Sequence, residues 1–555
     1  MTNHEIADHF ELLAKLMDIH NEDSFKAKSY ASAAFRVEKL PEQLSGLSTD
    51  ALKALPAIGA SLAAKIHELD ITGKLGILED YVQKTPPGVI DMLSIKGIGP
   101  KKISLLWKEL GLESIGELEY ACQENRLTTI KGFGAKTQQA ILDSIAFMRS
   151  NSGFCLYAAA DVVMAQITDR LQQSYPDALI SPAGAFRLQM PTLSRLDIVT
   201  TLNPEQILPA FAGMEYELAE AQDTQSLVVA LPGMPNIIFT LVPDATAFYK
   251  QLFSGSAAPE FLDAFAAQYQ LPDNIGSEQD IFTVNKLAYV HPAMRNNAAV
   301  LAQAAANNLP ELIMPSDIKG IIHSHSTYSD GQHSLKQMAD AAKAKGYEYL
   351  VISDHSQAAF YANGLTPERI RLQHEEIDKL NAQLAPFKIF KSIEADILND
   401  GQLDYTDDVL STFDLVIGSV HSNLKMTEEK AMHRLLTAIQ NPATRILGHP
   451  TGRLLLSRNG YPVDHKTLID ACAEHKVVLE INAHPRRLDL DWTWIEYALS
   501  KGVLLSINPD AHSIDGMDLV KYGVMAAQKG GLTTAQNLSS FSLAEMEQFI
   551  ATYKQ

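Results

Sequence analysis

Residues 315–555 alternate between short apolar runs and longer stretches with helical periodicity, about seven times. The runs include GII, YLVIS, FKIFKSI, LVIGSV, RILG and VLLSIN. A continuous apolar run predicts a strand that is buried on both faces, and strands that alternate with helices predict a parallel sheet. We therefore expect a closed β/α barrel in this part of the chain.

Histidines and carboxylates stand just after these runs. In chain order they are His323-Ser-His325 with Asp330 beyond it, Asp354-His355, Glu394, His421, His449 and Asp510-Ala-His512. The loops that follow barrel strands converge at one face, so these side chains are expected to meet. A single histidine after a strand is more often a core or loop residue, but packing does not explain so many runs that end alike. Imidazole and carboxylate ligands without thiolate favour zinc, manganese or iron, in numbers that suit two or three ions.

Residues 1–150 show helical periodicity broken by three similar glycine segments: LPAIGASLAAKI at 55–66, LSIKGIGPKKISLL at 93–106 and TIKGFGAKTQQAIL at 129–142. Each predicts a tight turn that opens a helix whose first amides are free to bind a phosphate oxygen. This is the helix-hairpin-helix pattern, which contacts nucleic acid without reading its sequence. Ordinary interhelical turns are the alternative, but three copies favour DNA contact, although Ala57 replaces a glycine in the first. The expected DNA-binding residues are Gly59, Gly97, Gly99, Lys101, Lys102, Gly132, Gly134 and Lys136.

Residues 151–310 mix predicted helices and short strands and are poor in cations, with 6 Lys and Arg against 15 Asp and Glu. The whole chain is 46% hydrophobic, carries a formal charge of −20 and has three distant cysteines, so no disulfide framework is indicated. No secretory leader or run long enough to span a bilayer is present, and we expect a cytoplasmic protein with no membrane partner. The segment PELIMPSDIKG at 310–320 is predicted to be an interdomain linker.

The C-terminal motifs GIIHSHSTYSDG, VISDHS, ANGL, SIEADILNDG, SVHS, RILGHPTGRLL, LEINAHPRRLDL and PDAHS occur in one order. With the hairpins before them, the chain resembles the bacterial family-X DNA polymerases that carry a C-terminal PHP phosphoesterase domain. The resemblance implies a multidomain protein with an all-α helix-hairpin-helix N-terminal region. It places a helical lyase-like domain at 1–90, helix-hairpin-helix fingers at 91–150, an α+β nucleotidyltransferase-like palm and thumb at 151–310, and a distorted (β/α)7 PHP barrel at 315–555.

The resemblance also implies a metal ligand set, which is complete here: His323, His325, Asp330, His355, Glu394, His421, His449, Asp510 and His512. In the expected allocation, Glu394 bridges an ion held by the first two histidines and an ion held by His355 and His421, and the other ligands share the first ion or complete a third position. Manganese or zinc is favoured and magnesium is an alternative. Arg453 and Arg486, or its neighbour Arg487, are candidate catalytic donors to the phosphate oxygens, with surface ion pairing as the alternative.

The predicted palm departs from the family. A family-X palm needs Gly-Ser and, on adjacent strands, Asp-x-Asp and a third Asp, because these carboxylates hold two magnesium ions. In GAFRLQMPTLSRLDIV, Ala185 replaces the serine, Arg195 replaces the first Asp and Asp197 remains. Ile238 stands at the position of the third Asp, and we therefore expect a degenerate palm without polymerase activity. The segment SGS at 254–256 resembles a nucleotide-binding remnant and is predicted to be a structural turn.

Lys65 aligns with the nucleophile of the family's lyase domain. A Schiff-base lyase needs an amine whose pKa is lowered by its surroundings. A solvated or phosphate-contacting lysine is the alternative, and the sequence does not decide between them.

The favoured function is metal-dependent phosphodiester hydrolysis on DNA, as a 3'-5' exonuclease or abasic-site nuclease in repair. The expected substrate is primer-template, gapped or abasic DNA, bound without sequence preference. The alternatives are a gap-filling family-X DNA polymerase, a PHP phosphomonoesterase acting on small metabolites and a non-catalytic DNA-binding scaffold.

Overall fold

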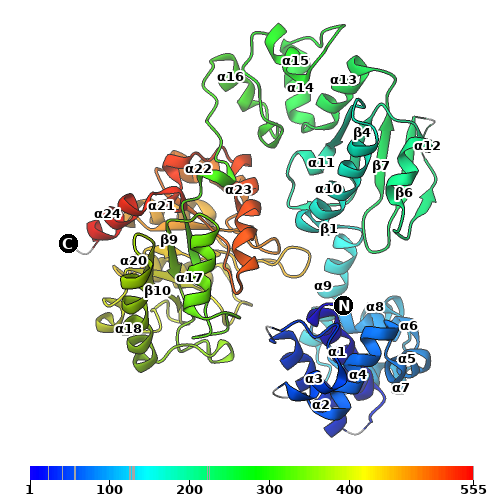
Figure 1. Ribbon diagram of the computed structural model, residues 1–555, viewed down its shortest axis with the longest axis vertical. Helices are drawn as coiled ribbons and strands as arrows, with labels where there is room; N and C mark the ends of the chain where they lie inside the picture. The colour runs from blue at the N-terminus through cyan, green and yellow to red at the C-terminus, as the bar shows by residue number, and fades with distance from the viewer. Residues whose placement is uncertain are drawn as a thin grey trace. The chain divides into compact units, whose positions relative to one another are not determined.

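The computed structural model describes residues 1–22, 24–40, 42–55, 58–123, 127, 132–221, 223 and 225–553. The chain divides into two compact units, Met1–Ser152 and Gly153–Gln555 (Figure 1). No helix in the described part of the chain is long and apolar enough to cross a membrane.

The first unit is helical. Its first helix shows why: Thr2 and Glu5 form a capping box, and Ile6, Phe10 and Leu13 recur at helical spacing on the buried face. The helices share one apolar core and are α1 (Asn3–Ile19), α2 (Ser24–Glu38), α3 (Thr49–Ala54), α4 (Ala60–Thr72), α5 (Gly76–Lys84), α6 (Pro87–Asp91), the 3-10 helix η1 (Met92–Ser94), α7 (Pro100–Leu110), α8 (Ile115–Gln123) and α9 (Ala135–Asn151).

The palm is a mixed sheet in the order β2-β4-β7-β6-β5, with β4 and β7 parallel and the other pairs antiparallel. Helix α10 packs on it through Ala160, Met164, Ile167 and Leu171. The elements are β1 (Cys155–Leu156), α10 (Tyr157–Ser174), β2 (Ile180–Ala183), α11 (Gly184–Arg187), β3 (Thr192–Leu193), β4 (Leu196–Thr200), α12 (Pro204–Ile207), η3 (Leu208–Phe211), β5 (Glu217–Ala219), β6 (Ser226–Ala230) and β7 (Ile237–Leu241).

A helical thumb follows the palm and is built around a cluster of phenylalanines, among them Phe253, Phe261, Phe265 and Phe282. Its helices are α13 (Ala245–Gly255), α14 (Pro259–Gln268), α15 (Glu278–Val284), η4 (Pro292–Met294) and α16 (Ala299–Ala305). The predicted α+β palm and thumb is thus observed.

The barrel lies within residues 225–553, which the structure describes without a gap, and its sheet runs β14-β13-β12-β11-β10-β9-β8 with every pair parallel. A bridge between Ser324 and Ala511 joins the two edges, so the seven strands nearly close, as predicted for a distorted (β/α)7 barrel. The strands are β8 (Gly320–Ser324), β9 (Tyr349–Ile352), β10 (Lys388–Asp396), β11 (Leu415–Ser419), β12 (Ile446–Leu447), β13 (Val478–Asn482) and β14 (Leu505–Asn508).

Helices cover the outside of the barrel (Figure 1). They are η5 (Pro315–Asp317), α17 (Leu335–Ala344), η6 (Phe360–Ala362), α18 (Pro367–Leu384), α19 (Asp407–Leu410), α20 (Glu428–Gln440), α21 (His465–His475), η7 (Trp492–Trp494), α22 (Ile495–Ser500), η8 (Asp515–Leu519), α23 (Val520–Lys529), η9 (Thr534–Gln536), η10 (Leu538–Ser540) and α24 (Leu543–Tyr553). The segment predicted as a linker, 310–320, packs on this layer: Ile313 is buried and donates its N–H to Leu532 O over 3.0 Å.

Helix α23 also contacts the palm and thumb. Lys521 Nζ and Tyr522 OH lie 3.0 and 3.2 Å from the Asp161 carboxylate on α10. Lys529 Nζ donates to Leu188 O over 2.6 Å and to Asn296 Oδ1 over 2.9 Å. The palm and the barrel are therefore parts of one unit, held together by polar contacts at both ends of this helix.

Candidate metal centre

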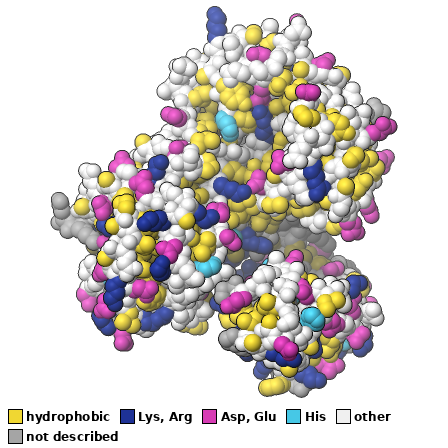
Figure 2. Space-filling view, viewed as in Figure 1, with side chains coloured by type: hydrophobic (Ala, Val, Ile, Leu, Met, Phe, Trp, Pro, Cys, Tyr) yellow, Lys and Arg dark blue, Asp and Glu magenta, His cyan; other side chains and the backbone are white. Residues whose placement is uncertain are grey.

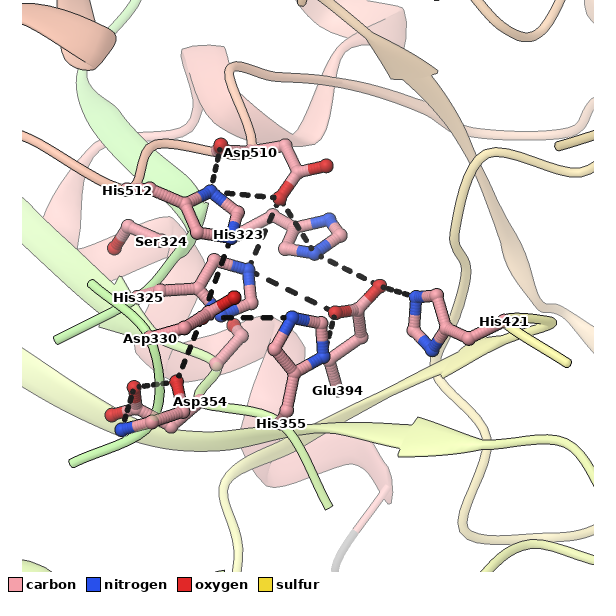
Figure 3. Close-up of polar contacts among 12 residues, drawn as sticks. His323, Ser324, His325, Asp330, Asp354, His355, Glu394, His421, Asp510 and His512 are labelled. Carbon is pink, nitrogen blue, oxygen red and sulfur yellow. Dashed lines mark hydrogen bonds and ion pairs between the residues drawn. The ribbon is translucent and has the colours of Figure 1, made fainter. Parts of the chain in front are cut away.

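The carboxyl ends of the barrel strands bring the predicted ligands together (Figure 3). His323 and Glu394 lie within β8 and β10, whereas the other residues lie at the end of a strand or in the loop after it. Three groups each have ligand atoms close enough to surround one ion: His355 with Glu394 and His421; His323 with His325 and Asp510; and His325 with Asp330, His355 and His512.

Glu394 lies at the centre of the cluster. Its Oε2 is 2.9 Å from His355 Nδ1, and its Oε1 is 3.0 Å from Nε2 of both His421 and His449. The same Oε1 is 3.2 Å from His323 Nε2. A carboxylate in this position is suited to bridging two ions, the role that the family resemblance implies for it.

The expected allocation let Asp510 and Asp330 share the first ion or complete a third position, and both carboxylates lie beside histidines of the cluster. Asp510 Oδ1 lies 3.1 Å from His325 Nε2 and 3.5 Å from His323 Nε2, so this carboxylate completes the group of the first two histidines. Asp330 Oδ1 lies 3.7 Å from His355 Nε2 and 3.5 Å from His512 Nε2. A third group therefore forms around Asp330, and the ligand assignments remain a prediction.

The environment fits divalent ions. The side chains of His323, His325, Glu394 and His449 are at most 1% exposed. Among the described residues, Nε2 of His323, Nδ1 of His325 and Oε2 of Glu394 are buried without a hydrogen-bond partner. Buried polar atoms are costly to leave unpaired, and atoms with lone pairs gathered at one point are what a bound cation would satisfy.

The electrostatics of the cluster agree with this fit. Burial lowers the pKa of His421, but Glu394 and Asp396 outweigh it and raise that pKa to about 10. Burial alone would raise the pKa of Glu394, yet His421, His323 and His355 hold it well below its usual value. The carboxylates thus create a negative potential that draws positive charge into the barrel mouth.

Two buried carboxylates that the sequence did not single out orient the histidines. Glu480 Oε2, on β13, lies 2.6 Å from His323 Nδ1, and Asp396 Oδ1, on β10, lies 2.6 Å from His421 Nδ1. Because an ionised carboxylate only accepts, each Nδ1 carries a proton, and Nε2 is the nitrogen that can give up its proton and bind an ion beside Glu394. Asp396 follows Glu394 by two residues on one strand and so shares its face, a signal that the sequence offered.

A third buried carboxylate, Asp354, shapes the loop that carries Asp330. It accepts from Ser326 N over 2.8 Å, Ser326 Oγ over 2.7 Å and Gln373 Nε2 over 2.6 Å. Its place just before His355 made it a candidate ligand, but these bonds assign it to holding the loop.

The structure separates the candidate arginine donors. The guanidinium of Arg453 pairs with Asp491 and donates to the carbonyls of Arg487 and Leu488. These contacts tie two loops together and favour the ion-pairing alternative for this residue. Arg486 is exposed. Its neighbour Arg487 is nearer, with Nε 3.7 Å from Asp510 Oδ2.

The hairpin glycines behave as predicted where the structure describes them. Gly97 and Gly132 have φ of 97° and 95°, and helices α4, α7 and α9 begin directly after Gly59, Gly99 and Gly134. A Cβ at any of these five glycines would meet nothing within 4 Å, which leaves room beside the helix N-termini. Lys101 and Lys136 are exposed in the first turns, and Lys102 lies over the Phe133 ring. Ala57 and residues 128–131 lie outside the described residues.

Lys65 is half-buried on α4. Lyase chemistry at this residue remains a prediction with the alternatives stated above.

The palm lacks the arrangement that two magnesium ions need. Asp197 on β4 is in register with Ile238 on β7, so an apolar side chain occupies the position expected for a second carboxylate. Arg195 donates from Nε to both Asp197 oxygens over 2.8 and 3.1 Å. Ala185 lies in α11. The SGS segment comprises the last two residues of α13 and its C-cap Ser256, so it ends a helix and does not form the separate turn that the sequence predicted.

Comparisons with known proteins agree with these observations. A helix-hairpin-helix domain family matches residues 1–75, a SAM-like helix-hairpin-helix tandem family matches residues 89–146 and the PHP domain family matches residues 322–484. A probable phosphatase from Vibrio atlanticus (strain LGP32) is 26% identical over 219 residues, 37% of this chain and 83% of the relative. One from Shewanella sp. (strain MR-4) is 29% identical over 165 residues, 29% of this chain and 60% of the relative.

A further relative covers nearly the whole chain. It is the DNA polymerase/3'-5' exonuclease PolX of Bacillus subtilis (strain 168), 34% identical over 562 residues, 97% of this chain and 98% of the relative. The hairpins, palm, thumb and barrel thus match in order, and the chain belongs to the bacterial family-X DNA polymerases (PolX) that carry a C-terminal PHP domain.

Proposed function

We propose that this chain is a metal-dependent DNA 3'-5' exonuclease of repair, acting on primer-template, gapped or abasic DNA, whose palm does not polymerise. The observation that carries the proposal is the contrast between two sites in one unit. The barrel brings eight of the nine predicted ligands into groups that could each hold an ion, and the ninth, His449, lies 3.0 Å from Glu394. The palm keeps one of the expected carboxylates, Asp197, and pairs it with Arg195. The PolX relative is named for a DNA polymerase and a 3'-5' exonuclease activity. Among the described residues of this chain, the expected metal ligands meet in the barrel and not in the palm.

The chain's own residues prepare the barrel site for hydrolysis. Glu480 and Asp396 accept from Nδ1 of His323 and His421, so that Nε2 of each imidazole is the nitrogen available to an ion. Divalent ions bound there would lower the pKa of a water molecule and neutralise charge on the cleaved phosphate. Arg487 is placed to donate to a phosphate oxygen beside Asp510. The same ligands suit manganese or zinc, with magnesium as the alternative.

The palm surface supports a non-catalytic role. Acidic side chains lie along its edge near β6 and α12, as Figure 2 shows on the face in view. The exposed acidic residues of this region are Glu205, Glu215, Glu217, Glu220 and Asp223. Such an edge repels a DNA backbone, so we assign sequence-independent DNA binding to the helix-hairpin-helix segments of the first unit.

One assay tests the proposal. The protein is incubated with Mn²⁺ and a labelled primer-template, with and without deoxynucleoside triphosphates. We expect the primer to be shortened in both reactions and never extended, and extension would overturn the account of the palm. His325→Ala and Glu394→Ala should abolish shortening and leave DNA binding unchanged, because both residues lie in the barrel.

Phosphomonoester hydrolysis is a second candidate, favoured by the likeness of the barrel to probable phosphatases. The two reactions are separated by comparing phosphate release from small phosphomonoesters with nucleotide release from DNA. Faster release from the monoesters at equal concentration would replace the exonuclease assignment.

A further inference from the structure

Two adjacent aromatic side chains stand exposed at the rim of the metal centre. Phe360 is 86% and Tyr361 59% exposed, in the loop between β9 and α18. The Tyr361 ring centroid lies 6.4 Å from that of His355, and the two aromatic rings are 6.0 Å apart at 78°. Neighbouring exposed rings at the mouth of a site indicate a surface that meets a ligand, since a ring without such a role is usually buried.

The loop holds these rings in place. Ala359 and Ala362, which flank them, are buried. The loop amides before them are bound: Gln357 N donates to Tyr405 OH over 3.1 Å, and Ala358 N donates to Asp404 Oδ2 over 2.6 Å. The exposure of the rings is thus a property of an ordered turn.

The far side of the turn is held equally firmly. A Cβ on Gly364 would come within 1.8 Å of Ser356 O, so the backbone closes on itself there. Asn363 adopts a φ of 57° and donates from Nδ2 to Tyr328 O over 3.3 Å, and Arg369 Nη1 donates to Asn363 O over 2.7 Å. The loop therefore presents the Tyr361 ring 6.4 Å from the His355 ring, with the Phe360 ring beside it.

We propose that Phe360 and Tyr361 form a stacking platform for the nucleobases beside the phosphodiester that the barrel cleaves. The inference rests on the proposed exonuclease function and adds a binding site for the bases of single-stranded 3' ends. Stacking suits such an enzyme because every base has an aromatic face, so the platform holds any sequence. Phe360 and Tyr361 are positioning residues: they fix the strand so that its terminal phosphodiester lies in the metal centre.

The test compares two DNA ends on the full-length protein with Mn²⁺. One oligonucleotide has natural nucleotides throughout, and the other has abasic tetrahydrofuran residues at its last two 3' positions. Variants are Phe360→Ala, Tyr361→Ala and the conservative Tyr361→Phe. The matched control is Leu218→Ala, because Leu218 is 57% exposed on β5 of the palm, outside the barrel. Metal content and circular dichroism are measured for every variant.

We expect each alanine variant to lose about tenfold in kcat/KM on the natural end, mainly through KM. On the abasic end the same variants should differ from wild type by less than about twofold, because no base is left to stack. Tyr361→Phe and Leu218→Ala should behave as wild type. Equal losses on both ends, or no loss on either, would overturn the platform.

A binding readout separates this inference from the proposed function. An oligonucleotide with 2-aminopurine at its 3' end is titrated with protein, and stacking on the platform should quench its fluorescence less in the alanine variants than in wild type. Quenching without any DNA shortening would keep the platform and end the exonuclease assignment. DNA shortening with equal quenching in all variants would keep the exonuclease assignment and overturn the platform.

Discussion

Replacing Glu480 by Gln tests whether a buried carboxylate outside the ligand set controls metal binding. Its Oε2 accepts from His323 Nδ1 over 2.6 Å and from Asn508 Nδ2 over 2.7 Å. Its Oε1 accepts from His449 N and Asn482 Nδ2, each over 3.0 Å. In all four bonds the Glu480 carboxylate is the acceptor. A glutamine keeps one acceptor oxygen, and its amide nitrogen can only donate.

Either amide orientation therefore sets an N–H against two donors. If the amide faces His323, the imidazole must move its proton to Nε2 and lose the lone pair that faces the cluster. If it faces the His449 N–H, that amide and Asn482 lose their acceptor. Two unmade buried bonds cost roughly 2–6 kcal/mol of folding free energy. Loss of such a supporting carboxylate typically weakens metal affinity about 10–100-fold.

The assay is calorimetric titration of the metal-free protein with Mn²⁺, together with the DNA-shortening rate. Glu547→Gln is the matched control, because Glu547 on α24 forms an exposed ion pair with Lys388 on β10, away from the metal centre. We expect Glu480→Gln to bind Mn²⁺ at least about tenfold more weakly than wild type, and the control to bind normally. Wild-type affinity in a folded Glu480→Gln protein would refute the role assigned to this carboxylate.

Three further predictions concern other parts of the chain. Arg195→Asp combined with Ile238→Asp places three carboxylates on neighbouring palm strands, so calorimetry should count one more Mn²⁺ per chain than in wild type; an unchanged stoichiometry would contradict the account of the palm. Gly97→Val and Gly132→Val force a branched residue to positive φ and should weaken DNA binding roughly tenfold in fluorescence anisotropy. Gly111→Val is the control, because Gly111 also has positive φ but lies outside the hairpins, and it should bind DNA normally. Burial lowers the pKa of Lys529 from 10.5 to about 7. At a pH between these two values the amine is protonated in the unfolded chain and neutral in the folded chain. Stability should therefore rise with pH from 7 to 10, by at most roughly 5 kcal/mol, and Lys529→Met should flatten that rise in pH-dependent unfolding; parallel curves would show that the lysine is not responsible.

The sequence predicted the barrel and the meeting of its ligands because both depend on local pattern. A run such as LVIGSV forms a strand wherever a sheet buries it, and His421 then falls at the strand end that faces the site. Glu480 escaped notice because it lies inside the apolar run of β13 and acts through His323, which is 157 residues away. The engagement of Arg453 with Asp491 was equally hidden, because a side-chain direction depends on neighbours that the sequence does not place together.

The distances between the ligand groups could not be read from the sequence. They depend on how side chains from different strands pack, and residue spacing does not encode that packing. The degenerate palm, in contrast, was visible in the residues themselves, and the register of Asp197 with Ile238 agrees with the alignment of the motif.

The contact between α23 and the palm has a consequence for any attempt to produce the barrel alone. Leu488, Tyr522 and Met525 are buried in a cluster to which Tyr157 of the palm contributes. A barrel expressed alone from residue 311 would lose the contact with Tyr157 and expose these apolar side chains to solvent, and we expect it to aggregate. The palm therefore also protects an apolar surface of the barrel from solvent, independently of any catalytic activity of its own.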